Sequence, residues 1–116
     1  MASAAELQDS LESFAESCNA NERLRVMNRD WNRTIHVHAS DLGCDFTLQS
    51  VSGAVSVQSG TAAEVSMAIR ATSDVLTEIF YGELSPNEPY NDGRLRVQGS
   101  ENDILHLDFI TAMLWG

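Results

Sequence analysis

The stretch SDVLTEIFYGELSPNEPYNDGRLRVQG, residues 73–99, decides the fold because it predicts a helix, a turn and a strand in succession. The cluster Thr72, Ser73 and Asp74 offers side-chain oxygens that can cap the helix, and apolar residues recur behind it at helical spacing. Gly82 is the predicted end of the helix, because glycine enters a left-handed cap without steric cost. Two prolines then indicate a turn, and residues 94–98 alternate as a half-buried strand.

The same stretch resembles the sterol-binding domain of the sterol carrier protein type 2 family. In that family a helix ends at glycine. The turn that follows contains, in order, a leucine, a proline, an aromatic residue and a glycine. A strand of alternating basic and apolar residues comes next and ends at glycine. The matching positions here are Gly82, Leu84, Pro86, Tyr90, Gly93, Arg94, Leu95, Val97 and Gly99. The family usually has lysine in place of Arg94, so the charge is preserved. The resemblance runs from residue 65 to the C-terminus, and it implies a hydrophobic tunnel between helices and sheet that the C-terminal segment closes.

Length and composition predict a single domain spanning residues 1–116, of which the first few are expected to be disordered. A chain of 116 residues buries enough surface for one core, and its 43% hydrophobic fraction is typical of a globular protein. A net charge of −10 argues against a nucleic-acid partner and against lasting adhesion to an anionic bilayer. The sequence contains neither a secretory signal pattern nor an apolar run long enough for a membrane span. We therefore expect a cytoplasmic protein without stable membrane insertion.

Hydrophobic periodicity predicts the remaining elements. Residues 4–19 have the pattern of an amphipathic helix. Alternating patterns predict a hairpin of residues 23–28 and 34–39 around residues 29–32, and strands at residues 44–51, around 55–57 and at 63–71. Such alternation indicates a sheet with one solvated face and one covered face. Three predicted helices are available to cover the second face. The predicted class is a two-layer α+β domain with five or six mostly antiparallel strands and helices on one face.

The last predicted helix follows a capping pair formed by Ser100 and Asp103, and it is apolar nearly all round. Such a helix needs burial on more than one side. Packing on the first helix, contact with a second subunit, or a cavity holding an apolar guest would each provide this burial, and the family resemblance favours the cavity. The candidate ligand-binding residues, each of which could equally be plain core, are Leu11, Phe14, Met67, Leu76, Ile79, Phe80, Phe109, Ile110, Met113 and Trp115.

Motifs for catalysis or for metal binding are weak in this sequence. It contains no lysine, no nucleophile elbow, no zinc-protease motif and no glycine-rich phosphate loop, so neither an enzyme nor a cofactor is expected. His36 and His38 share one face of a predicted strand, and Asp41, Cys44 or Asp45 could complete a metal site with them. That face is expected to be the solvated one, so no metal is predicted.

The preferred hypothesis is a non-catalytic carrier of a fatty acyl, acyl-CoA, sterol-like or isoprenoid ligand. The sheet would form the floor of its binding site, the helices the walls, and the turn at residues 82–93 the mouth. The alternative is an interaction module in which the apolar last helix forms a homodimer or docks on an enzyme. A third hypothesis is a metal-dependent hydrolase built on the two histidines.

Overall fold

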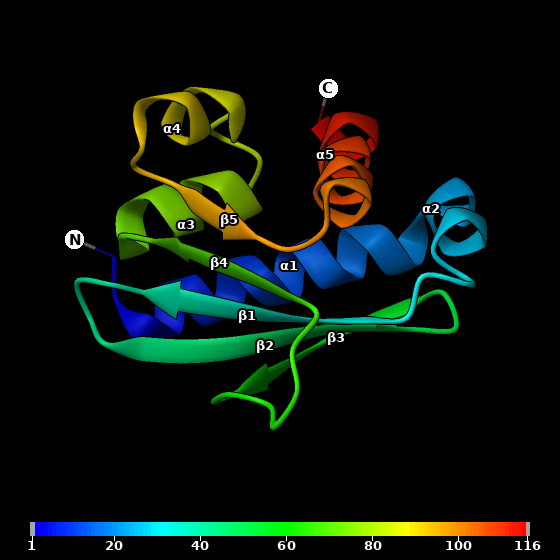
Figure 1. Cartoon of the computed structure of the whole chain (residues 1–116), viewed down its shortest axis with the longest axis horizontal. Coiled ribbons are helices and arrows are strands. Elements are labelled where there is room, and N and C mark those ends of the chain that lie inside the picture. The colour runs from blue at the N-terminus through cyan, green and yellow to red at the C-terminus, as the bar shows by residue number, and fades with distance from the viewer. Residues whose placement is uncertain (1, 116) are drawn as a thin grey trace.

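Five strands form one sheet in the computed structural model, which describes residues 2–115 (Figure 1). The strands are β1 (Arg33–Ala39), β2 (Cys44–Val51), β3 (Ala54–Ser59), β4 (Met67–Ala71) and β5 (Arg96–Gln98). The helices are α1 (Ala4–Ala20), α2 (Glu22–Met27), α3 (Ser73–Phe80), α4 (Asn87–Asp92) and α5 (Glu101–Trp115). The strand order is β3-β2-β1-β4-β5, and only the central pair of β1 and β4 is parallel. The predicted α+β class is therefore confirmed, with a mixed sheet.

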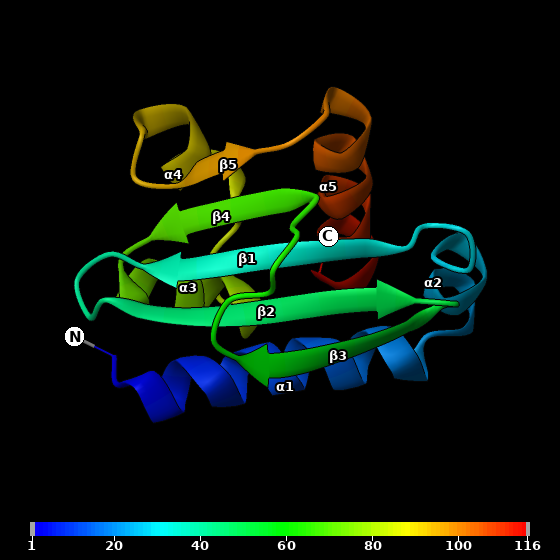
Figure 2. The same ribbon diagram turned by 60° about the horizontal axis from the view of Figure 1, so that its bottom comes forward.

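The core lies between the sheet and the helices. Ile35 pairs with Leu48 and Val37 pairs with Phe46, and all four side chains are buried. They point to the same side of the sheet as the helices, because alternate residues of a strand face alternate sides. Figure 2 shows the sheet in front of α1, α3 and α5, so its other face is not covered by helices. The expectation of one covered face is confirmed.

Residues 23–28, predicted as a strand, instead lie mostly in helix α2. The side chain of Asn21 caps this helix by accepting a hydrogen bond of 3.1 Å from the backbone N–H of Leu24. Leu24 is buried whereas Val26 is 62% exposed, so the two do not share a buried strand face. The predicted hairpin around residues 29–32 is wrong as a consequence, and β1 pairs antiparallel with β2 through the turn at residues 40–43.

The turn between α3 and β5 is more regular than the sequence predicted. It contains the short helix α4, in which Pro89 is buried. Proline is tolerated there because the backbone N–H groups of a first helical turn have no partner within the helix. The long strand predicted for residues 63–71 is shortened to β4, since Val65 lies outside it and is 44% exposed.

The first turn of α3 is capped from another part of the chain. Thr72 occupies the cap position but makes no side-chain hydrogen bond there. The carboxylate of Asp41 instead accepts hydrogen bonds from the backbone N–H of Ser73 at 2.8 Å and from its hydroxyl at 2.7 Å. These hydrogen bonds hold the pKa of Asp41 below its usual value. The β1–β2 turn thereby fixes where α3 begins.

Position 82 requires glycine because of its backbone conformation and because the Trp115 side chain lies close to it. Its φ is +81°, and a Cβ added to it would lie 2.5 Å from the indole nitrogen of Trp115. We expect Gly82→Ala to lower the free energy of unfolding by about 3 kcal/mol, the sum of backbone strain and overpacking. Gly93 is a matched control, because its φ is +87° but nothing lies within 4 Å of an added Cβ. Gly93→Ala should cost about 1 kcal/mol in urea denaturation; equal losses would contradict a tight indole contact.

Within residues 2–115, none of the helices combines the length and the apolar character needed to cross a membrane.

Candidate functional site

A cavity of about 530 Å³ lies among α3, α4, β5 and α5. Its floor includes Ile69 of β4, and its deepest wall is formed by buried residues of α3. Exposed side chains, among them Tyr90 and Leu105, line it nearer the surface. The apolar lining side chains are Ile69, Leu76, Ile79, Phe80, Pro86, Tyr90, Leu95, Val97, Ile104, Leu105 and Leu107. A cavity of this volume and lining is suited to an apolar small molecule.

The polar part of the lining is neutral or acidic. It consists of Asn87, Asn91, Glu101, Asp108 and Thr111, and no arginine belongs to the lining. Glu101 and Asp108 are exposed and both lie on α5. Their carboxylates give this part of the cavity a negative potential. An anionic group is repelled by this potential, whereas a neutral group is not.

Behind the α3 wall lies a cluster of aromatic side chains. The rings of Phe14 and Phe80 meet edge to face with centroids 5.2 Å apart, and Phe14 lies 5.8 Å from Trp115. Phe80 lines the cavity while Phe14 and Trp115 do not. Phe80 therefore belongs both to the cavity lining and to the aromatic cluster.

The structure divides the ten candidate residues into three groups. Leu76, Ile79 and Phe80 line the cavity. Phe109 is 63% exposed and lies outside the lining. The others pack in or against the core without lining the cavity, and they are Leu11, Phe14, Met67, Ile110, Met113 and Trp115.

Several lining residues were absent from the sequence-based candidates. Tyr90, Leu95 and Val97 all belong to the stretch that carries the family resemblance, so that motif was the available signal. Ile104 and Leu107 come from α5, whose apolar residues surround the whole helix and give no preferred side.

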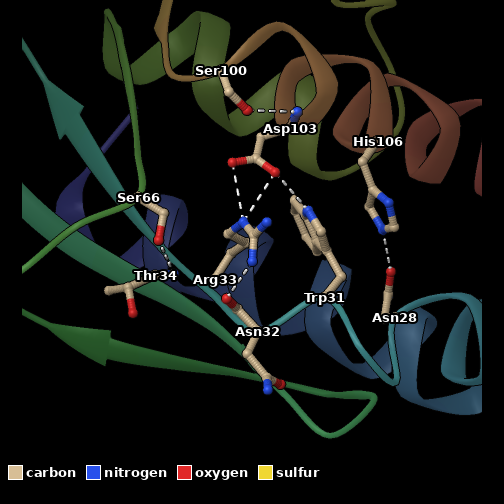
Figure 3. Close-up of polar contacts among 9 residues, drawn as sticks. All are labelled: Asn28, Trp31, Asn32, Arg33, Thr34, Ser66, Ser100, Asp103 and His106. Atoms are coloured by element: carbon tan, nitrogen blue, oxygen red, sulfur yellow. Dashed lines mark hydrogen bonds and ion pairs between the residues drawn. The ribbon is translucent and has the colours of Figure 1, made fainter.

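A polar network attaches the first half of α5 to the start of β1 (Figure 3). The carboxylate of Asp103 accepts hydrogen bonds from Nε1 of Trp31 at 2.9 Å and from Nε of Arg33 at 3.0 Å. The backbone N–H of Asp103 donates to the hydroxyl of Ser100 at 3.1 Å, which confirms the Ser100 half of the predicted capping pair, while the Asp103 carboxylate is bound by Trp31 and Arg33 instead. Burial acts to raise the pKa of Asp103, but these hydrogen bonds outweigh it and hold the pKa below its usual value.

His106 extends this network by one helical turn. Its ring stacks on the indole of Trp31 with centroids 3.9 Å apart, and its Nε2 lies 2.6 Å from Oδ1 of Asn28. Burial lowers the pKa of His106, so its neutral form is favoured. Two polar side chains of α5 thus hold the helix that supplies one wall of the cavity.

A protein-family model matches most of this chain. Residues 11–110 match the model of the SCP-2 sterol transfer family. A comparison with curated protein sequences finds no significant match. The matched region covers most of the 116 residues.

Solved structures share the fold at low sequence identity. The sterol carrier protein domain 2 of Helicoverpa armigera is 15% identical with a TM-score of 0.76, over 96% of this chain and 89% of that one. The SCP2-type ubiquinone synthesis protein UbiJ is 15% identical with a TM-score of 0.69, over 98% and 95%. The sec-alkylsulfatase Pisa1 from Pseudomonas sp. is 16% identical with a TM-score of 0.63, but the match covers 79% of this chain and only 14% of the sulfatase. With the family match over residues 11–110, the conclusion is that this chain belongs to the SCP-2 sterol transfer family.

Proposed function

We propose that the chain is a non-catalytic carrier that binds one long apolar ligand in the cavity among α3, α4, β5 and α5. Its family supports a lipid-carrying role. The observation that carries the proposal is the cavity of about 530 Å³ whose inner wall consists of the buried apolar residues Leu76, Ile79 and Phe80. That volume lies within the range of small-molecule sites.

The hydrophobic effect gives such a site an affinity suitable for transport. Burying an acyl chain contributes roughly 0.8 kcal/mol per methylene, so a chain of about fourteen carbons has roughly 11 kcal/mol of driving force. Association and chain ordering offset several kcal/mol of this, which leaves a Kd of about 1 μM. A ligand bound at that strength is retained and yet can be released.

The charge of the lining narrows the class of ligand. Glu101 and Asp108 are the charged residues of the lining, and the whole chain has a net charge of −10. Both features oppose the phosphates of an acyl-CoA and, less strongly, the carboxylate of a free fatty acid. The proposed ligand is therefore a lipid with an uncharged head group, such as a sterol-like or isoprenoid alcohol.

A competition experiment tests this selectivity. The protein is loaded with a fluorescent long-chain alcohol and titrated with an unlabelled alcohol, a fatty acid and an acyl-CoA of matched chain length. We expect the acyl-CoA to compete at least about tenfold more weakly than the alcohol at low salt, with the difference narrowing as salt screens the repulsion. Equal competition would contradict the electrostatic argument, and failure of every lipid to bind would contradict the carrier function itself.

The exposed part of α5 supports one alternative function. Phe109 is 63% exposed and does not line the cavity, so its ring is available to a second copy of the chain or to an enzyme. If a second copy of the chain binds there, sedimentation would show a stable dimer, and Phe109→Glu would convert that dimer to a monomer. A monomer that contains co-purified lipid would support the carrier instead.

A further inference from the structure

His36 and His38 alternate with buried residues of β1, and Asp45 precedes the buried Phe46 of β2, so the three meet on the sheet face that the helices leave uncovered. That face is in front in Figure 2. The strand register places His38 directly opposite Asp45, and His36 lies two residues before it on the same face. Nε2 of His36 lies 2.6 Å from Oδ1 of Asp45, and Nδ1 of His38 lies 2.7 Å from the same oxygen. Both imidazoles therefore converge on one carboxylate oxygen.

We propose that these three side chains bind a divalent transition-metal ion, with zinc as the first candidate. Their ligand atoms all lie within 4.8 Å of one another. Imidazole nitrogen and carboxylate oxygen are ordinary zinc ligands, and a site with three protein ligands keeps a fourth position for water or another small ligand. With metal–ligand bonds of about 2.0–2.1 Å, tetrahedral ligand atoms lie about 3.3 Å apart. The two nitrogen–oxygen distances, 2.6 and 2.7 Å, would therefore lengthen by about 0.6–0.7 Å.

The surroundings allow an ion to enter. The side chains of His36, His38 and Asp45 are 23%, 26% and 32% exposed, so the ligand atoms are partly sheltered without being sealed from solvent. They line a second cavity, of about 520 Å³, to which Arg70 and Arg96 also contribute.

The charges around this site have opposing effects on the binding of a cation. The two arginines are exposed, so solvent weakens their repulsion of a cation, and they favour an anion at the open coordination position. The net charge of −10 attracts cations to the molecule as a whole. In the absence of an ion, Asp45 is the hydrogen-bond partner of both histidines. Each imidazole would bind the metal as a neutral ligand through the nitrogen that faces Asp45, with its remaining proton on the other ring nitrogen.

Cobalt titration tests the site directly, with untagged protein so that no histidine tag competes. Co²⁺ at a zinc site of low coordination number gives visible d–d absorption, and added Zn²⁺ should displace it with the loss of that absorption. We expect one equivalent of Co²⁺ to bind. His38→Gln and Asp45→Asn should each weaken the binding about 100-fold or more, because loss of a direct ligand costs at least as much as loss of a residue that orients one.

Asp92→Asn is the matched control. Asp92 is an exposed carboxylate that pairs with Arg94 at 2.9 Å, away from this cluster, and its replacement should leave cobalt binding unchanged. Near-ultraviolet circular dichroism of each variant confirms that the fold is retained. The two cavities share Ile69, but none of the substituted residues lines the lipid cavity, so lipid binding by the same variants should be unaffected.

Three results would overturn the proposal. They are the absence of stoichiometric cobalt binding by the wild-type chain, equal binding by the folded ligand variants, and a sulfur-to-cobalt charge-transfer band, which would indicate a thiolate ligand instead. Cys18 is an unsuitable source of that thiolate, because burial raises its pKa to about 12. A charge-transfer band would therefore indicate that the half-buried Cys44 is the thiolate ligand.

Discussion

Replacing Leu105 with glutamate is expected to lower the affinity for a fluorescent long-chain alcohol by at least about tenfold. Leu105 lines the cavity, and a carboxylate there must lose solvent or displace the ligand chain. It would also lie on the helix that already contributes Glu101 and Asp108 to the lining. The fold should tolerate the change, because the Leu105 side chain is 56% exposed. Fluorescence titration measures the affinity, and thermal unfolding confirms that stability is retained.

Phe109→Glu is the matched control for this prediction. Phe109 lies one helical turn beyond Leu105 on α5 and is 63% exposed, but it does not line the cavity. The same charge at this position should change the affinity by less than about twofold, since the two variants differ chiefly in their position relative to the cavity. Leu105→Gln separates the effect of charge from that of shape. If Phe109→Glu alone abolished binding, the ligand would lie further along α5 than the cavity that Leu105 lines.

The elements predicted well from sequence are those with strong and regular patterns. The predicted strand at residues 44–51 coincides with β2, and the predicted first helix differs from α1 by one residue. The failure at α2 has a physical cause. Leu24 and Val26 alternate as in a strand, but a side-chain cap from Asn21 stabilises a helical turn in which only Leu24 is buried. A short segment therefore follows its cap and its packing rather than its alternation.

The candidate site was harder to predict, because its residues depend on how α5 is rotated. The apolar residues of α5 surround the helix, and the fold turns Ile110 into the core, Leu105 to the cavity and Phe109 to solvent. The polar contacts of Asp103 and His106 fix that rotation. The partners of these two side chains lie 70 to 78 positions earlier in the chain, so no local pattern of the sequence could reveal them.

Replacing Asp103 with asparagine is expected to lower the free energy of unfolding by about 2 kcal/mol at neutral pH. Asparagine retains one oxygen that can accept from Nε1 of Trp31, but it loses the charge that faces Arg33 and places an amide N–H₂ group among donors. The side chain of Asp103 is only 10% exposed, so water replaces little of the lost interaction. Urea denaturation measures the change. Lipid affinity should fall as well, because the loosened helix supplies Ile104 and Leu107 to the cavity.

The pH dependence separates the charge of Asp103 from its shape. Its pKa is lowered in the folded state, so its charge stabilises the wild-type chain above the ordinary carboxyl pKa of about 3.9, and this contribution is lost as the pH falls through the folded-state pKa. Asparagine cannot titrate. The stability difference between the two chains should therefore stay constant from about pH 7 to 5 and narrow below about pH 4.

Asp92→Asn serves as the control for an exposed ion pair. Asp92 contacts Arg94 two residues away, and both side chains are nearly half exposed, at 46% and 48%. Its loss should cost less than about 0.5 kcal/mol at any pH. Equal effects of the Asp103 and Asp92 substitutions would show that the Asp103 network does not anchor α5. In that case the contact of Trp115 with Gly82 and the burial of Ile110 would have to hold the cavity wall in place.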